Sequence, residues 1–194
     1  MKISRWVWGC AMIFLLAGVA SAQDEAPKAE VFAGYSYVRV NPGFAGAPGV
    51  NFNGGSASFS YNPTGWLGLV GDFGGYHGSA FGIGADVYSY LFGPKLALRR
   101  GAFTPYVQTL FGGAHGSAGF DCMPPSARVH REGVLISCGS GSENAFAMTI
   151  GGGVDWNATE HIGIRVIQAE YLMTRFLSNT QNNARISTGV VFRF

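Results

Sequence analysis

The sequence predicts an all-β fold, an eight-stranded antiparallel up-and-down transmembrane β-barrel, and three observations support this prediction. Apolar and polar residues alternate with a period of two through most of the chain after residue 30. Only 12% of the 194 residues are charged, while 30 are glycine. The last residues carry aromatic side chains at a fixed spacing. A soluble β-sandwich would place charge on its outer face, so the low charge favours a barrel whose outer face meets lipid.

The first residues have the order of a secretory signal peptide. Lys2 and Arg5 precede an apolar run at 6–20, and Ala20-Ser21-Ala22 provides small residues for cleavage. We therefore expect residues 1–22 to be a cleaved signal peptide and residues 23–194 to form the barrel domain. The mature chain then carries 11 basic and 11 acidic residues, a balance that gives no indication of a nucleic-acid partner.

The alternation assigns side chains to two faces of each strand. Tyr35 and Tyr37 share one face of the first segment, whereas Gly34 and Ser36 lie on the other. The same contrast of bulky apolar against small or polar residues recurs along the chain. We expect the bulky face to meet lipid and the small or polar face to line a narrow lumen, inside a closed barrel that leaves no backbone group unpaired.

Eight strands are expected, at residues 31–40, 53–61, 66–76, 82–98, 103–113, 144–156, 161–173 and 184–194. Residues 62–65, 99–102 and 157–160 are predicted to form tight turns, and the other four gaps longer loops rich in Gly, Pro and Asn. Short turns on one side and longer loops on the other are typical of outer-membrane barrels, with the turns periplasmic. The fourth segment can be read in either phase.

The end of the chain carries the most specific motif. Ser187-x-Gly189-x-x-Phe192-x-Phe194 resembles the terminal signal by which Gram-negative outer-membrane proteins are recognised by their assembly machinery. With the eight strands, the mature chain resembles the OmpA/OmpX-type family of small outer-membrane barrels. The resemblance implies an outer-membrane location, with outer-membrane lipids and the assembly machinery as partners. The sequence does not set the oligomeric state.

One short motif occurs twice, as GGYHGSA at 74–80 and as GGAHGSA at 112–118. In each copy a histidine and a serine two residues later are expected to point outward at the rim. This resembles lipid A deacylases, in which a histidine activates a serine and an acid orients the histidine. The nearby acid Asp72 should face the lumen, so the motif is interpreted as rim architecture, and no catalytic residue is predicted.

Metal and cofactor sites are not expected, because the histidines lack ligand spacing and the mature cysteines lack a Cys-x-x-Cys arrangement. Cys122 and Cys138 both fall in the long segment 114–143, on the oxidising side of the membrane. An even pair there favours a disulfide. Closing this loop of roughly 17 residues would stabilise the protein by about 3 kcal/mol.

The segment IGIRVIQAEYLM contains a conflict of phase. If Val166 faces lipid, Arg165 faces the lumen, but strict alternation then sends Glu170 outward, where a charge near the midplane costs roughly 2 to 4 kcal/mol. A β-bulge between Val166 and Gln168 would bring Gln168 and Glu170 into the lumen. Alternatively, the strand is regular and Glu170 lies above the membrane. With the bulge, the expected lumen network comprises Asp72, Arg165, Glu170 and Arg185, and Lys95 is a further possible partner.

The barrel size limits the function. At eight strands the interior is just wide enough to be filled by side chains, so a general diffusion pore is not expected. The sequence therefore indicates a non-enzymatic protein with a structural or surface-contact role in the cell envelope. A narrow porin-like channel for small solutes and a lipid A-modifying enzyme are the alternatives.

Overall fold

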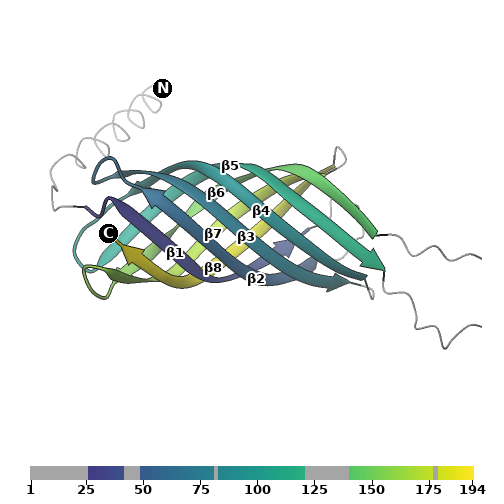
Figure 1. Ribbon diagram of the computed structural model, residues 1–194, viewed down its shortest axis with the longest axis horizontal. Coiled ribbons are helices and arrows are strands. Elements are labelled where there is room, and N and C mark those ends of the chain that lie inside the picture. Colours follow the sequence, from purple (N-terminus) through teal and green to yellow (C-terminus); the bar gives the residue numbers. More distant parts are fainter. Residues whose placement is uncertain (1–25, 42–48, 81–82, 121–139, 177–178) are drawn as a thin grey trace, which may run out of the picture.

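The computed structural model describes residues 26–41, 49–80, 83–120, 140–176 and 179–194. Eight strands make up this part of the chain: β1 Ala29–Val40, β2 Val50–Tyr61, β3 Leu67–Ala80, β4 Ile83–Ala97, β5 Phe103–Phe120, β6 Ser140–Asn157, β7 Ile162–Phe176 and β8 Asn179–Arg193. They follow one another around a closed barrel in sequence order (Figure 1). The predicted fold class is confirmed. Within these residues, no helix has the length and apolar character needed to cross a bilayer.

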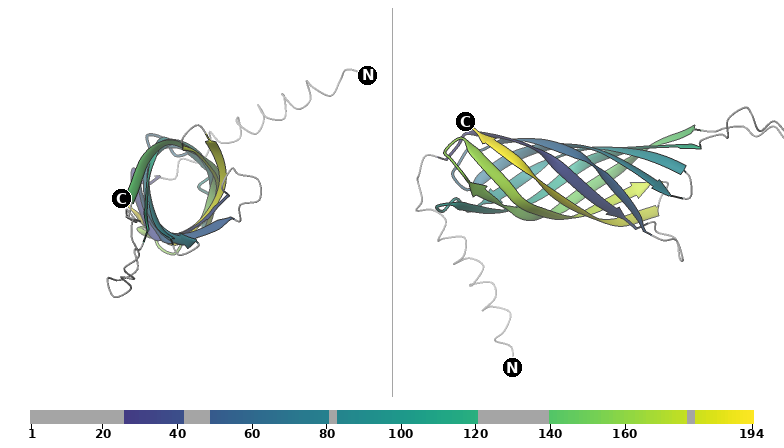
Figure 2. Two further views of the ribbon diagram at one scale, coloured as in Figure 1. Left: turned by 90° about the vertical axis from the view of Figure 1, so that its right-hand side faces the viewer. Right: turned by 90° about the horizontal axis from the view of Figure 1, so that it is seen from below.

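All eight neighbouring pairs are antiparallel. The closing pair, β1 with β8, runs from Glu30 opposite Arg193 to Arg39 opposite Ala184. A view along the barrel shows the strands as a complete ring (Figure 2). Because each strand has a partner on both sides, the wall presents no open edge to lipid.

The connections fall into two groups at opposite ends. The turns at 62–66, 98–102 and 158–161 lie at the same end as the start of β1 and the end of β8, which we call the turn end (Figure 1). Gly101 has a φ of 62° there, a conformation that favours glycine. These are the three predicted tight turns. At the opposite, open end, β5 and β6 project beyond the other strands (Figures 1 and 2).

Several strands are longer than predicted, mainly toward the open end. β5 continues to Phe120, and only residues 177–178 separate β7 from β8, so much of the expected loops at 114–143 and 174–183 is strand. The predicted lengths were wrong because they were taken from the alternation of apolar residues. That alternation ends near the open end, where the outer face lies beyond the apolar band. The backbone ladder continues regardless of that face.

The outer face of the barrel is a band of large apolar side chains. Tyr88, Tyr90 and Phe92 point outward and Ser89 and Leu91 inward, which settles the phase of the fourth segment. Exposed apolar residues recur on all eight strands, among them Tyr35, Phe59, Leu69, Phe73, Phe92, Val107, Phe111, Phe146, Ile150, Tyr171 and Ile186. The predicted assignment of bulky faces to lipid agrees with this band.

β7 contains the predicted bulge. Its pairing with β8 shifts register between Arg165 and Gln168, and the two consecutive residues Val166 and Ile167 are both exposed, by 53% and 46%. The extra residue reverses the phase of the strand. Arg165, Gln168 and Glu170 are therefore all buried inside the barrel.

Candidate functional site: the barrel lumen

The lumen has two parts of opposite character. From the turn end to the middle it is filled by ionisable side chains, which we call the lumen plug: Glu30, Asp72, Lys95, Arg99, Asp155, Arg165, Glu170, Arg185 and Arg193. Toward the open end it is lined by apolar side chains, which we call the apolar cup: Val38, Phe52, Tyr76, Val87, Ala114 and Leu172.

The plug consists of three layers along the barrel axis. Arg185 on β8 is the centre of the layer nearest the open end, and it is 1% exposed. Its Nη1 donates to Asp72 Oδ1 at 2.7 Å and to the Tyr76 hydroxyl at 3.0 Å, and its Nε donates to Glu170 Oε2 at 2.6 Å. Gln108 also donates to Glu170, at 2.8 Å. One guanidinium thus joins carboxylates from β3 and β7 across the lumen, using the fork geometry that suits arginine.

Arg165 holds the next layer. Its Nε donates to Asp155 Oδ1 at 2.8 Å and its Nη1 to Gln168 Oε1 at 2.7 Å. The guanidinium carbon lies 4.2 Å from the centre of the Phe32 ring and 4.7 Å from that of Tyr106. Cation–π contacts and ion pairing together compensate for the water this charge has lost.

Glu30 organises the layer nearest the turn end. It accepts hydrogen bonds from Lys95 and, at 3.3 Å, from Arg99, and Arg193 Nε lies 3.5 Å from its Oε1. Three cations therefore surround one carboxylate that is 3% exposed. With the two layers above, the charged groups occupy the lumen from the turn end past its middle.

Glycines on the lumen face make room for these long side chains. A Cβ atom at Gly151 would lie 2.3 Å from the carbonyl oxygen of Ala169 and 2.8 Å from Glu170 Cγ. One at Gly153 would lie 2.4 Å from the carbonyl oxygen of Ile167 and 2.8 Å from the Tyr106 hydroxyl. These distances are well below van der Waals contact for a carbon atom, so a larger residue would push against the backbone of β7 as well as against Glu170 and Tyr106. The glycine run at 151–153 thus suits a wall packed against charged side chains.

The structure brings Asp72, Glu170 and Arg185 into direct contact, whereas Arg165 belongs to the adjoining cluster. Lys95 pairs with Glu30, not with Arg165 or Glu170, which corrects its expected place. Sequence reasoning placed Gln168 in the lumen, but it missed the carboxylates Glu30 and Asp155 as partners of the buried cations. Each side chain lies on the face of its strand that points into the lumen, so alternation alone could have placed it there. Its pairing with a residue across the barrel could not be predicted from the sequence.

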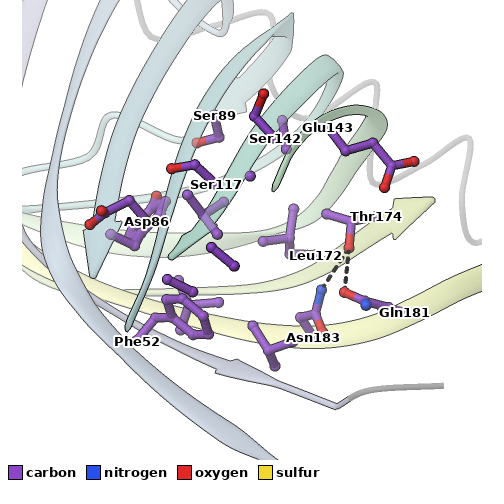
Figure 3. A pocket seen from close by; sticks show the side chains of 18 of the residues that line it. Phe52, Asp86, Ser89, Ser117, Ser142, Glu143, Leu172, Thr174, Gln181 and Asn183 are labelled. Carbon is purple, nitrogen blue, oxygen red and sulfur yellow. Dashed lines mark hydrogen bonds between the residues drawn. The ribbon is translucent and has the colours of Figure 1, made fainter. Parts of the chain in front are cut away.

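The apolar cup contradicts the expectation of a uniformly small or polar lumen face. Phe52 and Leu172 point into the same space from opposite walls, around a cavity of about 450 Å³ (Figure 3). Leu91 and Leu110 are fully buried in the same apolar cluster. The prediction was wrong because several strands carry apolar residues on both faces. Only the bulky residues on the outward face were considered when the character of the lumen was predicted.

The two copies of the repeated motif lie on the outer face near the open end. His77 and Ser79 are exposed, and His77 Nδ1 lies 2.8 Å from Asp86 Oδ1 on β4. An acid is therefore present, contrary to the sequence analysis, because cross-strand pairing places Asp86 opposite His77. In the second copy His115 Nδ1 lies 2.9 Å from the amide oxygen of Asn144.

Neither serine completes a catalytic arrangement. No hydrogen bond joins Ser79 to His77 or Ser117 to His115 among the described residues. The same part of the chain holds no group of three His, Cys, Asp or Glu side chains that could bind a metal ion. His77 and Asp86 are both well exposed, without the burial that strengthens a catalytic pair.

The other predicted residues are placed as follows. Ser187 is buried in the lumen, where its hydroxyl lies 2.7 Å from that of Ser36, and Phe192 and Phe194 point outward at the turn end. The role of the terminal motif in assembly stays a prediction. Cys122, Cys138 and the predicted signal peptide at 1–22 lie outside the described residues.

Comparison of the sequence with protein-family models finds no match, and comparison with curated proteins finds none either. Solved structures do match. Neisserial surface protein A is 13% identical with a TM-score of 0.65, over 88% of this chain and 100% of that one. Ail, the attachment invasion locus protein of Yersinia pestis, is 18% identical with a TM-score of 0.58, over 86% and 99%.

The N-terminal β-barrel domain of Pseudomonas aeruginosa OprF is 16% identical with a TM-score of 0.51, over 88% of this chain and 100% of that one. At these identities the similarity concerns the fold, and it extends over nearly the whole of each matched chain. The chain has the closed eight-stranded architecture of the small outer-membrane β-barrels, the OmpA/OmpX type that its sequence resembles.

Proposed function

We propose that this protein is a non-enzymatic, non-conducting barrel of the Gram-negative outer membrane, with a structural or surface-contact role in the envelope. The lumen plug is the observation that carries the proposal. Arg185, Arg165 and Lys95 are each 4% exposed or less, and each is paired with a carboxylate from another strand. Ions would have to displace these pairs to pass, so the barrel acts as a wall element and not as a pore.

The open end is where contact with other molecules takes place. β5 and β6 pair as far as Gly119 opposite Ser140 and project from the barrel there. Projecting elements on a rigid scaffold are the usual carriers of binding in such folds. The apolar band is surrounded by outer-membrane lipids, and the terminal motif at 187–194 is read by the assembly machinery.

The structural neighbours support a surface role without defining a ligand. Ail is named for attachment and invasion, and it was also solved with the heparin analogue sucrose octasulfate. Among the described residues at the open end of this barrel, the two basic residues Arg39 and Arg175 are equal in number to the acidic residues Asp86 and Glu143. Because no basic cluster is present among these residues, we do not extend polyanion binding to this chain.

The porin-like alternative is tested by conductance. The refolded full-length mature chain, inserted in a planar bilayer, is expected to give no single-channel steps, because the plug closes the lumen. A variant in which the paired residues of all three plug layers are replaced by alanine, once shown to be folded, should conduct. The control Arg175→Ala, at an exposed position, should stay silent. Regular channel steps from the wild type would contradict the proposal.

The same refolded sample tests the enzyme alternative. Incubation with lipid A is expected to leave its mass unchanged, since neither Ser79 nor Ser117 is hydrogen-bonded to its neighbouring histidine. A loss of acyl mass that Ser79→Ala or Ser117→Ala abolishes would show that the rim motif is catalytic, and the non-enzymatic assignment would then be wrong.

A further inference from the structure

We infer that the apolar cup binds the hydrocarbon chain of a single-chain amphiphile with an uncharged head group, taken up as a monomer from the external water. This site is additional to the surface-contact role and does not depend on it. The lumen of a membrane barrel is ordinarily polar. Here its outer part is lined by Val38, Phe52, Val87 and Leu172, directly above a charged plug.

The cup is hollow, although the cluster below it is tightly packed. Leu91, Leu110 and Ala147 have no measurable exposure, yet a cavity of about 450 Å³ lies beside them. This size is within the roughly 300 to 1,000 Å³ of small-molecule sites. Side chains that served only to fill the lumen would not leave such a void, which lowers stability. Water finds few polar partners on apolar walls, so an apolar occupant fits better.

The geometry of the wall selects a slender ligand. The interior of an eight-stranded barrel is about as wide as the side chains that fill it, so only a narrow molecule enters. The ladder between β2 and β3 is continuous from Phe52 opposite Gly78 to Tyr61 opposite Leu69, and that between β3 and β4 from Leu67 to Ala80. Because these walls have no lateral gap, entry is from the open end. A single chain dissolved in external water can enter there, and a two-tailed bilayer lipid cannot.

The mouth of the cup selects the head group. Asn183 donates to the Thr174 hydroxyl at 3.1 Å, and that hydroxyl donates to Gln181 at 3.3 Å (Figure 3). These neutral groups suit a hydroxyl or amide head. Glu143 is among the residues at the same mouth, and no lysine or arginine of the described chain lines the cup, so a carboxylate or phosphate head would meet no positive charge there.

Methyl NMR of the full mature chain in nanodiscs of deuterated lipid tests the inference, with 1-dodecanol as the probe. We expect saturable shifts and nuclear Overhauser contacts at the lumen methyls of Val38, Val87 and Leu172. The outward methyls of Leu69 and Val107, which are 56% and 58% exposed, serve as internal controls and should show no saturable change. Equal, non-saturating changes in both sets would show partition into lipid only and would overturn the site.

Matched variants and a second probe sharpen the test. Ala85→Phe, which fills the cup, should weaken dodecanol binding by at least about tenfold, whereas Ala57→Phe on the lipid face should leave it unchanged. Dodecanoate should bind at least about tenfold more weakly than dodecanol, and equal affinity would refute the assignment of an uncharged head. Contacts from the lumen methyls to protonated bilayer lipid, or to residues 121–139, before any probe is added would refute the proposed occupant.

Discussion

Replacing Arg185 by alanine is expected to lower the free energy of unfolding by about 3 to 5 kcal/mol, the usual cost of removing one partner from a buried ion pair. The substitution leaves Asp72 and Glu170 buried, with both carboxylates deprived of their cation. It also removes the donor to the Tyr76 hydroxyl. The loss arises from uncompensated charge in the lumen, not from any contact with lipid.

Urea unfolding of the refolded barrel in lipid vesicles measures this loss, with the fluorescence of Trp66 and Trp156 on the outer face as the signal. The matched control Arg175→Ala removes an exposed arginine of β7 and should change the free energy of unfolding by less than about 0.5 kcal/mol.

A third variant separates charge from packing. Combining Arg185→Met with Asp72→Asn and Glu170→Gln removes all three charges while keeping most of the volume, and should recover most of the stability. If Arg185→Ala costs no more than the Arg175→Ala control, the plug does not stabilise the barrel.

Deleting Ile167 is expected to prevent formation of a stable barrel. The bulge lets Val166 and Ile167 both face lipid, so without it one half of β7 must reverse its faces. Either Arg165 or Glu170 then points into the membrane, at a cost of roughly 2 to 4 kcal/mol. The partner left in the lumen, Asp155 or Arg185, loses its counter-charge, which adds about 3 to 5 kcal/mol.

The fraction of heat-modifiable, folded protein in the outer membrane measures this effect. Ile167→Ala keeps the bulge and removes only exposed surface, so this variant should assemble nearly as well as the wild type. A deletion variant that accumulates as folded barrel at the wild-type level would show that the phase shift at residues 165–168 is not required.

The sequence was sufficient to predict the barrel because a membrane wall imposes the same period on every strand. The outward position of Tyr35, for example, was identified by alternation alone. The bulge on β7 was also predictable, because a charge at Glu170 on the lipid face is costly enough to force the phase to change. These inferences require only the local chain and the polarity of the solvent around it.

Contacts across the lumen could not be predicted in the same way. The pairing of Lys95 with Glu30 across the lumen depends on strand register and barrel closure, which alternation does not fix, and the outer-face pairing of His77 with Asp86 also depends on register. The apolar cup was missed for a related reason. Val38 and Leu172 each stand next to an outward aromatic residue, Tyr37 or Tyr171, and they form one inward surface only after the barrel closes.

This chain forms a barrel with an apolar outer face and a charged lumen, and a bulge in β7 brings the charged residues of that strand inside. Spin-label accessibility along β7 is the measurement that bears on this claim. Labels are attached to single cysteines at Val166, Ile167, Gln168 and Ala169, in a background with Cys122→Ser and Cys138→Ser. The account predicts high oxygen accessibility at 166 and 167, low accessibility at 168 and high accessibility again at 169. Strict alternation across these four positions, or equal exposure of all four to a water-soluble relaxation agent, would contradict it.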